Sequence, residues 1–327
     1  MTPTASDLDL RRRYFAEELE AVCKLRSPRL VEAFAQVPRE QFLGPGPWTV
    51  MADSDFAMPG AAPLQARATR TTRDADPGRV YHNIAVAIDP SRMLFNGQPG
   101  TLAVWIDALD LAEGGRVLHV GAGTGYYTAI MAHCVGGRGR VVAFEVDAAL
   151  AEKARANLAS MPWVEVVCGD ASQPSSGARE RAAEERLGAS ASPSATEPGS
   201  GAEPRIEFDA IVINAGVTHP LPWWLDALAD DGRMILALTG TMPAMPSTIG
   251  KGMVLLVTRR DDTFEARATA VVAIYSAMGL RDEEMNARLG KALMAGPMQW
   301  QAIKSIRRDS HEQTSSCWLH GDGWCLS

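Results

Sequence analysis

The feature that most constrains the fold of this chain is a short apolar run that leads directly into three glycines. Residues 116–120 read RVLHV, and Gly121, Gly123 and Gly125 follow in the spacing G-x-G-x-G. Glycine lets the backbone turn sharply and approach a ligand closely. Because a helical pattern begins at Tyr126, the segment predicts a strand, a tight loop and a helix, with a ligand on the loop.

Apolar runs of this kind recur between residues 100 and 260, and helical patterns separate most of them. Alternating strands and helices indicate parallel strands joined by crossover helices. The runs are almost continuously apolar, which is typical of a sheet covered on both faces. We therefore predict a doubly wound, Rossmann-like α/β sheet from RVLHV (116–120), RVVAFEV (140–146), VEVVC (164–168), FDAIVIN (208–214), RMILAL (233–238) and GMVLLVT (252–258).

The region before the sheet differs in pattern. Residues 1–95 are expected to form a helical cap and a covering segment, and the sheet domain is expected to span 96–260. Two short helices, punctuated by Pro28 and Pro38, open the cap. The many Pro, Gly and small residues over 44–80 predict irregular structure.

Two further segments differ from the sheet domain. Residues 172–205 contain one large apolar residue, Leu187, and cannot bury enough surface to offset their ordering entropy. They predict a disordered insertion. Residues 261–327 form a C-terminal extension, which begins with a strand-like run and continues with a helix around 281–294.

The composition of the chain argues against nucleic acids and membranes as partners. The net charge of −7 and the pI of about 5.5 argue against broad binding to nucleic-acid phosphates. No run reaches the roughly 18 apolar residues that span a bilayer, so no membrane partner is expected. The five cysteines are scattered and contain no CxxC motif, which favours a reduced, cytoplasmic protein.

The glycine loop does not fit the two familiar phosphate-binding loops. A dinucleotide loop has G-x-G-x-x-G, and its last glycine is replaced here by Tyr126. A Walker loop needs GK[ST], which is absent. Taken alone, G-x-G-x-G is a weak signal and is also typical of a plain strand–helix turn.

Two acidic residues strengthen the case for a ligand. Glu145 ends the second strand, where an acid can accept both hydrogen bonds of a ribose diol. Asp170 follows the third strand and can accept from the exocyclic amine of adenine. Each acid alone is also typical of a helix N-cap or a solvated loop. Together with the glycine turn, they indicate an adenosine without phosphates, and we predict S-adenosyl-L-methionine as the cofactor.

At these motifs the sequence resembles a known family. The segments VLHVGAGTGYYTAIMAHCVG, AFEVD, VVCGDAS and FDAIVINAG are similar to those of the protein-L-isoaspartate O-methyltransferases, a branch of the class I methyltransferases. LVEAFAQVPREQFLG and YHNIAVAI match upstream, and GQP at 97–99 stands where the family has Ser-Gln-Pro. The similarity covers roughly residues 10–45 and 80–258.

The resemblance implies a role for each matching position. The glycines would pass under the methionine part of the cofactor, and the strand-end acids would hold ribose and adenine. A loop further upstream would close over the methyl group. The cofactor-binding residues are then His119, Gly121, Gly123, Gly125, Glu145, Val146, Asp170, Ala171 and Asn214, and the substrate loop is Asn96, Gly97 and Gln98.

The sequence also departs from the family at several of these positions. Gly97 replaces a serine associated with the reacting carboxylate, and His119 replaces an acid that faces the cofactor. His82 replaces the acid before the Asn-Ile-Ala segment, and NAGVTHP adds Asn214 and His219 near the same sheet edge. These differences leave open whether the acceptor is an isoaspartyl residue.

The chemistry of the acceptor decides whether a base is needed. A carboxylate with a pKa of about 4 is already ionised at neutral pH, so orientation and exclusion of water suffice. An amine or hydroxyl would need a base, for which His82, His119 and His219 are candidates. For each of these histidines taken individually, a structural role without catalysis is the favoured interpretation.

The end of the chain reads SSCWLHGDGWCLS, in which GDG predicts a turn between two short strands. Cys317, His320 and Cys325 have a loosely ligand-like spacing. Three candidates with a long gap make a poor zinc signature, so we expect a tryptophan-anchored hairpin and no metal.

The sequence therefore favours an S-adenosylmethionine-dependent methyltransferase acting on a carboxylate of a protein, peptide or peptide-like product. A small-molecule methyltransferase with a histidine base is the alternative enzyme. A non-catalytic S-adenosylmethionine-binding protein that recruits a partner is the alternative outside enzymes.

Overall fold

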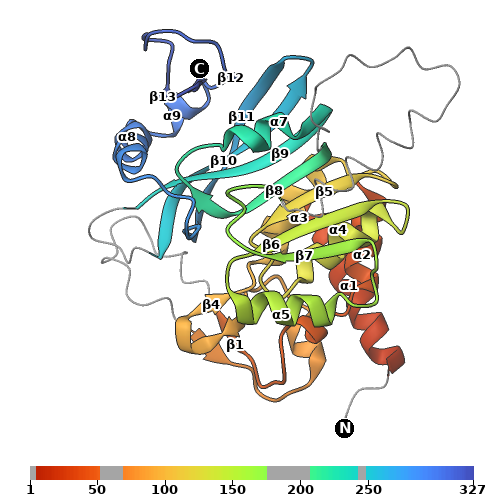
Figure 1. Cartoon of the computed structure of the whole chain (residues 1–327). Coiled ribbons are helices and arrows are strands. Elements are labelled where there is room, and N and C mark those ends of the chain that lie inside the picture. Colours follow the sequence, from red (N-terminus) through yellow and green to blue (C-terminus); the bar gives the residue numbers. More distant parts are fainter. Residues whose placement is uncertain (1–4, 52–68, 175–206, 242–247) are drawn as a thin grey trace, which may run out of the picture. The chain divides into compact units, whose positions relative to one another are not determined.

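The structure is a computed structural model that describes residues 5–51, 69–174, 207–241 and 248–327 (Figure 1). Most of the predicted insertion therefore lies outside the described residues. The chain divides into two compact units. Unit 1 comprises Met1–Gly114, Ala122–Arg140 and Asp147–Glu165, and unit 2 comprises Gly115–Gly121, Val141–Val146 and Val166–Ser327.

Unit 1 is mainly helical. Ser27 caps the second helix by accepting from the Leu30 N–H, and Pro28 occupies the first turn, where its missing N–H costs nothing. Asp107 accepts from the backbone N–H groups of Arg26 and Ser27, each at 2.9 Å, which ties the third helix to the start of the second. The helices are α1 (Ala5–Cys23), α2 (Pro28–Gln36), α3 (Pro99–Leu109), α4 (Tyr126–Val135) and α5 (Ala148–Asn157).

A set of short elements completes unit 1. Thr49–Met51 pairs antiparallel with Thr69–Thr71, so the prediction of irregular structure is wrong for these two segments. Strands of three residues are too short to leave a periodic signal in the sequence. The elements are η1 (Arg39–Phe42), β1 (Thr49–Met51), β2 (Thr69–Thr71), η2 (Pro77–Val80), β3 (Ala87–Asp89), η3 (Pro90–Arg92) and β4 (Leu94–Phe95).

The strands of unit 2 belong to a ten-stranded sheet in the order β13-β14-β12-β11-β10-β9-β8-β5-β6-β7. β8 pairs parallel with both β5 and β9. The strands are β5 (Arg116–Val120), β6 (Arg140–Glu145), β7 (Val164–Cys168), β8 (Phe208–Val217), β9 (Leu228–Gly240), β10 (Ile249–Arg260), β11 (Thr263–Tyr275), β12 (Ser305–Arg307), β13 (Leu319–Gly321) and β14 (Trp324–Leu326).

The prediction of parallel pairing is wrong for the sixth predicted strand. β10 pairs antiparallel with β9 and with β11, and the three long strands lie side by side in Figure 1. Only residues 241–248 connect β9 to β10, whereas a parallel crossover needs a dozen residues or more. The helix before β9 is short, because α7 (Pro222–Asp226) ends just before β9 begins at Leu228.

The C-terminal extension confirms the predicted strand, helix and hairpin. β11 is followed by α8 (Glu283–Met294), α9 (Pro297–Trp300) and the β13–β14 hairpin. Thr269 is an extra residue in β11, because Ala268 and Ala270 pair with successive residues of β10. β11 pairs with β12 only at Phe264 and Glu265.

The core of unit 2 extends along the sheet into the extension. Leu118, Phe144, Ile211 and Leu255 are buried in the same cluster as Trp324. Across the described residues, no helix is both long and apolar enough to cross a membrane.

Candidate functional site

Three strand ends meet in unit 2, where the sequence predicts a ligand site. β6 lies between β5 and β7. The Gly121 N–H donates to the Phe144 carbonyl at 2.9 Å, and the Gly169 N–H donates to the Glu145 carbonyl at 3.0 Å. Gly121, Glu145 and Asp170 therefore stand at neighbouring strand ends, and we call these three residues the strand-end cluster.

The glycine loop has the backbone that its sequence predicts. Gly121, Gly123 and Gly125 have φ values of +85°, +57° and +95°, in the left-handed region that favours glycine. A Cβ on Gly121 would lie 2.9 Å from the Asn214 carbonyl oxygen, and one on Gly125 would lie 2.9 Å from Leu158 Cδ1. The Asn214 backbone leaves no room for a side chain at Gly121, whereas at Gly125 the positive φ disfavours one and Leu158 would have to move.

Side-chain amides hold both ends of this loop. In unit 2, Asn214 Nδ2 donates to the Gly121 carbonyl at 3.3 Å. In unit 1, Asn157 Nδ2 donates to the Thr124 carbonyl at 2.9 Å. The predicted set includes Asn214 but not Asn157, which looks like an ordinary helix-end residue in the sequence.

Glu145 is a nearly buried acid, with 8% of the residue exposed. It is the last residue of β6, and Val146 follows it with 41% exposure. A carboxylate has two oxygen atoms that each accept hydrogen bonds, so an acid at a strand end can serve a ligand that donates two of them.

The turn after β7 is held in an unusual conformation. Ala171 is buried and has a φ of +57°, and its carbonyl accepts from Trp223 Nε1 at 3.1 Å. Asp170 accepts from the Ser172 N–H at 2.9 Å. Gly279 approaches from the extension so closely that a Cβ there would lie 2.6 Å from Asp170 Oδ2. Trp223 and Gly279 fall outside the predicted set, because both are distant in sequence.

His119 lies inside β5, where it pairs in register with Val212, and it is fully buried. Burial lowers its pKa to about 3, because the charged imidazolium loses its hydration. The ring is therefore neutral at physiological pH and is unsuited to act as a general base. A direct contact of His119 with the cofactor stays a prediction.

The predicted substrate loop belongs to unit 1 and is rigidly held. Asn96 Oδ1 accepts from the Val86 N–H at 3.0 Å, whereas its Nδ2 is buried without a hydrogen-bond partner among the described residues. Gln98 Nε2 donates to the Asn83 carbonyl at 3.1 Å. The Gly97 carbonyl accepts from the Tyr127 hydroxyl at 3.2 Å. We call residues 96–98 the acceptor loop.

Gly97 shows why the family's serine is absent. Its φ is +81°, and a Cβ would lie 3.1 Å from Leu102 Cδ2. A serine in this backbone would be strained and crowded. The departure therefore involves the backbone of the loop as well as the lost hydroxyl.

A buried arginine organises the segment around the acceptor loop. Arg39 is fully buried and donates to the carbonyls of Val80 at 2.6 Å, His82 at 3.0 Å and Ile84 at 2.6 Å. It also donates to Asn96 Oδ1 at 3.3 Å. Arg39 falls outside the predicted set, although a charged residue between the apolar residues of the VPRE segment is a usable signal in the sequence.

The other two candidate bases differ in burial. His82 is exposed. His219 is half-buried, its Nδ1 lies 2.8 Å from Thr218 Oγ1, and burial lowers its pKa. The structure gives neither histidine a carboxylate hydrogen-bond partner that would orient it as a base.

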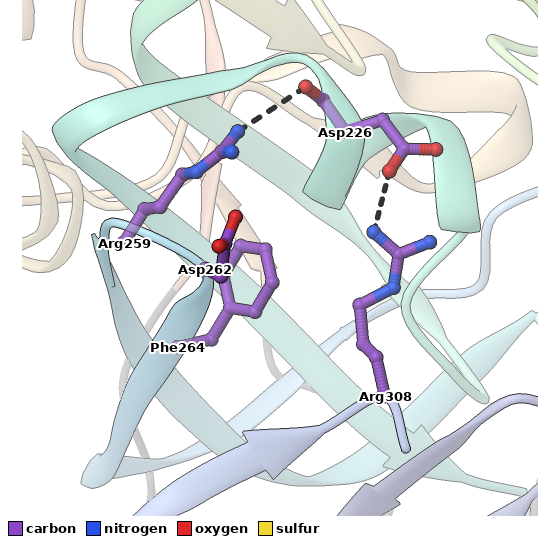
Figure 2. Close-up of a pocket in the computed structure, with 5 residues that line it drawn as sticks. All are labelled: Asp226, Arg259, Asp262, Phe264 and Arg308. Atoms are coloured by element: carbon purple, nitrogen blue, oxygen red, sulfur yellow. Dashed lines mark hydrogen bonds and ion pairs between the residues drawn. The ribbon is translucent and has the colours of Figure 1, made fainter. Parts of the chain in front are cut away.

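Each unit also carries a surface pocket. In unit 2, a cavity of about 380 Å³ is lined by side chains that mostly pair with one another (Figure 2). Arg308 pairs with the Asp226 carboxylate, and Arg259 donates to the Leu228 carbonyl at 2.7 Å. Since Asp226 and Leu228 flank the start of β9, this cavity lies at the end of β9 opposite to its carboxyl end.

The pocket of unit 1 has a different character. Its volume is about 530 Å³, and its lining is rich in cationic side chains. Arg79 pairs with Asp74 at 3.1 Å. The lining residues are Val50, Arg70, Thr71, Thr72, Arg73, Arg79, His82 and Ile84.

The fold matches solved methyltransferases. A protein-L-isoaspartate O-methyltransferase matches over 86% of this chain and 68% of its own, with a TM-score of 0.52 and 22% identity. A putative protein-L-isoaspartate O-methyltransferase from Plasmodium falciparum, solved with S-adenosyl-L-homocysteine, matches over 81% of this chain and 97% of its own, with a TM-score of 0.53 and 15% identity. The chain thus has the Rossmann-like fold of the class I methyltransferases.

Sequence comparison gives the family. The profile of the protein-L-isoaspartate(D-aspartate) O-methyltransferases matches residues 67–245. Protein-L-isoaspartate O-methyltransferase 1 of Archaeoglobus fulgidus is 27% identical over 72% of this chain and 82% of its own. The enzyme of Methanothrix thermoacetophila is 32% identical over 55% of this chain and 71% of its own. The chain belongs to this family and is an S-adenosylmethionine-dependent methyltransferase.

Proposed function

We propose that this enzyme transfers a methyl group to a carboxylate of a protein or peptide, and that the strand-end cluster binds its cofactor. The observation that carries the proposal is the meeting of a glycine turn, a buried acid and a second acid at three adjacent strand ends. Family membership supports the same assignment, because its relatives are named for O-methylation of isoaspartyl residues in proteins.

The residues present fit S-adenosylmethionine. The left-handed glycine turn leaves the backbone bare, and Asn214 fixes its first carbonyl. Glu145 suits the two hydroxyls of a ribose, and Asp170 suits the amine of an adenine. Ala171 follows Asp170 in a conformation fixed by Trp223, so the backbone at the proposed adenine position is ordered before binding. Val146, Gly123 and Gly125 complete the proposed set.

In the proposed reaction, the main task of the protein is to position the cofactor and the acceptor. The cofactor supplies a methyl group on a sulfonium, which leaves as a neutral thioether. A carboxylate acceptor is ionised at neutral pH, so no residue of this chain has to remove a proton. The neutral state of buried His119 agrees with a site that lacks a general base. Orientation and exclusion of water then supply most of the rate enhancement.

The cationic pocket of unit 1 supports an anionic acceptor. Arg70 and Arg73 line it without an ion-pair partner among the described salt bridges, whereas Arg79 is paired with Asp74. Positive charge favours acidic peptides over neutral ones. We propose that this pocket binds acidic residues that flank the methylated carboxylate, and that the acceptor loop positions the carboxylate itself.

Methyl transfer to isoaspartyl peptides tests the function. We expect calorimetry to show binding of S-adenosylmethionine, and tritiated methyl to enter an isoaspartyl peptide as a base-labile ester. A matched aspartyl peptide is the control. A base-stable product would reject carboxylate methylation, and cofactor binding without transfer to peptides or cell extract would favour the non-catalytic alternative.

Charge reversal in the pocket tests the acceptor class. Arg70→Glu should raise the KM for an acidic peptide and leave both kcat and cofactor affinity nearly unchanged. The matched control is Arg138→Glu, because Arg138 is a highly exposed arginine of unit 1 outside this pocket. Equal KM values for the two variants would contradict the pocket's role.

A further inference from the structure

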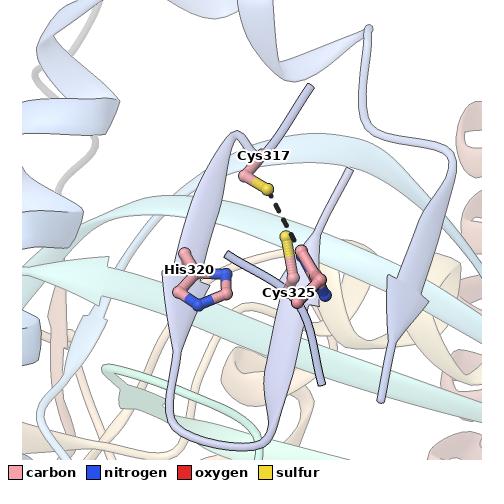
Figure 3. Close-up of side chains that lie close together, drawn as sticks. Cys317, His320 and Cys325 are labelled. Carbon is pink, nitrogen blue, oxygen red and sulfur yellow. Dashed lines mark hydrogen bonds between the residues drawn. The ribbon is translucent and has the colours of Figure 1, made fainter. Parts of the chain in front are cut away.

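Four potential metal ligands converge in the C-terminal extension. One ligand atom from each of His311, Cys317, His320 and Cys325 lies within 4.8 Å of all the others. Three of these side chains are labelled in Figure 3, where the two sulfur atoms point toward each other and the His320 ring stands beside them. The sequence predicts only those three as candidate ligands, and His311 is the fourth.

The spacing of these atoms is close to that of a tetrahedral zinc centre. With bonds of about 2.3 Å to sulfur and about 2.0 Å to nitrogen, the ligand atoms of such a centre stand roughly 3.3–3.8 Å apart. His311 Nε2 and Cys317 Sγ are 3.4 Å apart. The other ligand atoms lie within 4.8 Å of one another, so contraction by at most about 1.0–1.5 Å would close the site.

The surroundings orient the ligands as in known metal sites. His311 Nδ1 lies 2.9 Å from the Asp309 carbonyl, so it can donate there and leave Nε2 unprotonated toward Cys317. The Thr314 N–H donates to Cys317 Sγ at 3.3 Å, which stabilises a thiolate. His320 Nδ1 is buried and has no hydrogen-bond partner among the described residues.

The backbone brings the remaining ligands together independently of any metal. His320 and Cys325 are cross-strand partners in the β13–β14 hairpin, whose turn contains Gly323 with a φ of +72°. Cys325 is fully buried and Cys317 is 8% exposed. Four protein ligands with little solvent access leave no open coordination position, which is typical of a structural metal and not of a catalytic one.

We propose that His311, Cys317, His320 and Cys325 bind one Zn²⁺ ion as a closed Cys₂His₂ site that locks the C-terminal extension. Binding releases the thiol protons, and the two thiolates neutralise the charge of the ion. Zinc is favoured over harder cations because two sulfur and two nitrogen ligands in a tetrahedron are its preferred set. This site is separate from the strand-end cluster and does not depend on the proposed acceptor.

Metal content of the full-length protein is the first test. We expect about one zinc per chain after purification under reducing conditions without added metal or chelator. Replacement by Co²⁺ should give the visible absorption of a tetrahedral centre with thiolate-to-cobalt charge transfer. This measurement needs no variant, so it stands even if substitutions impair folding.

Variants identify the ligands. Cys317→Ser and His311→Gln should each lose most of the bound zinc and lower the Tm, whereas Cys23→Ser, in α1, should keep both. Chelation of the native protein should lower its Tm to a similar degree and expose two thiols to a thiol reagent.

The alternative for the two cysteines is a disulfide, which would use neither histidine. A mass lower by two hydrogens, with a Cys317–Cys325 linkage and no zinc in protein kept reduced during purification, would overturn the proposal. Zinc at far below one per chain, or retained equally in Cys317→Ser, would also overturn it.

Discussion

The strand-end cluster and the acceptor loop differ in how closely they match the family motifs that the chain resembles. The resemblance places the family's glycines and acids at the strand-end cluster, whose geometry comes from strand ends and left-handed glycines. It places the family's serine at Gly97 of the acceptor loop, where the backbone would strain a serine. Under the proposed roles, cofactor binding depends on backbone geometry that tolerates little change, whereas acceptor choice depends on a few side chains.

This difference predicts that mutations in the two regions impair different properties of the protein. Substitutions around the acceptor loop should alter stability or methyl transfer and leave cofactor affinity intact. Substitutions in the strand-end cluster should weaken cofactor affinity and leave the stability of the acceptor loop intact.

The largest effect is expected at Arg39. Arg39→Met leaves the carbonyls of Val80, His82 and Ile84 buried without their donor, so it should destabilise the protein by about 3 kcal/mol or more. Urea unfolding measures the loss. Arg138→Met, at an exposed site, is the control and should cost little. Unchanged stability would show that Arg39 does not organise this segment.

Glu145→Ala should weaken S-adenosylmethionine binding by roughly 30- to 100-fold, since hydrogen bonds to a charged group contribute about 1.5–3 kcal/mol. Calorimetry gives the affinity, and Glu152→Ala, at an exposed acid of α5, is the control. An affinity within twofold of the native value would remove Glu145 from the proposed cofactor site.

His119 is the position in the proposed cofactor region at which this chain differs from the family motif. Its burial makes the free energy of unfolding depend on pH. Its folded pKa is lowered to about 3 from an ordinary value near 6.5, so below pH 6.5 the unfolded chain binds a proton that the folded chain does not. Stability should therefore fall as pH drops from 6.5 toward 3, by about 1.4 kcal/mol per unit.

Urea unfolding of the native protein and of His119→Gln at pH 7, 6 and 5.5 measures how the free energy of unfolding changes with pH. The variant should show a shallower pH dependence, and exposed His82→Gln should keep the native one. Parallel curves for all three proteins would mean that the pKa of His119 is the same in the folded and the unfolded chain.

Gly97→Ser restores the family's residue and should cost about 1–2 kcal/mol of stability. Gly114→Ser is a matched control, because Gly114 has a φ of +83° but open space around its Cβ position. Thermal unfolding should show the larger loss at Gly97, with cofactor affinity unchanged. A variant that is as stable as the native protein and transfers methyl faster would contradict the argument from backbone strain.

Gly279→Ala should have the smallest effect, a decrease of about threefold in cofactor affinity, because the new Cβ displaces Asp170 without removing its charge. Gly296→Ala is the control, with a φ of +93° and no neighbour within 4 Å of its Cβ position. Equal affinities would indicate that Asp170 adjusts freely.

The sequence predicted the sheet and the strand-end cluster well, because both depend on local patterns. Apolar runs fixed β5 and β7 to the residue, and YYTAIMAHCV matches α4 in full. The predicted run RVVAFEV (140–146) extends one residue beyond β6, which ends at Glu145, so the predicted strand end was correct to within one residue.

The features that the sequence did not predict all depend on contacts distant along the chain. Arg39 reaches carbonyls more than 40 residues away, and Trp223 holds Ala171 from the start of another helix. β10 runs antiparallel to β9 because the connection between them is short, and the residue composition of β10 does not reveal this direction. His311 joins the cysteines only after the chain folds back, so spacing in the sequence gave an incomplete ligand set.

The extra residue in β11 has a consequence for the molecule's neighbours in solution. Beyond Ala266, whose N–H donates to the Lys304 carbonyl at 2.8 Å, β11 has no pairing with β12 among the described residues, and an unpaired strand edge can template the addition of a foreign strand. Thr269 interrupts the regular spacing of β11, and its hydroxyl donates to the Val254 carbonyl at 3.2 Å. An irregularity of this kind twists the strand and disfavours edge-to-edge addition of another strand, so the extra residue should help to protect β11 against aggregation.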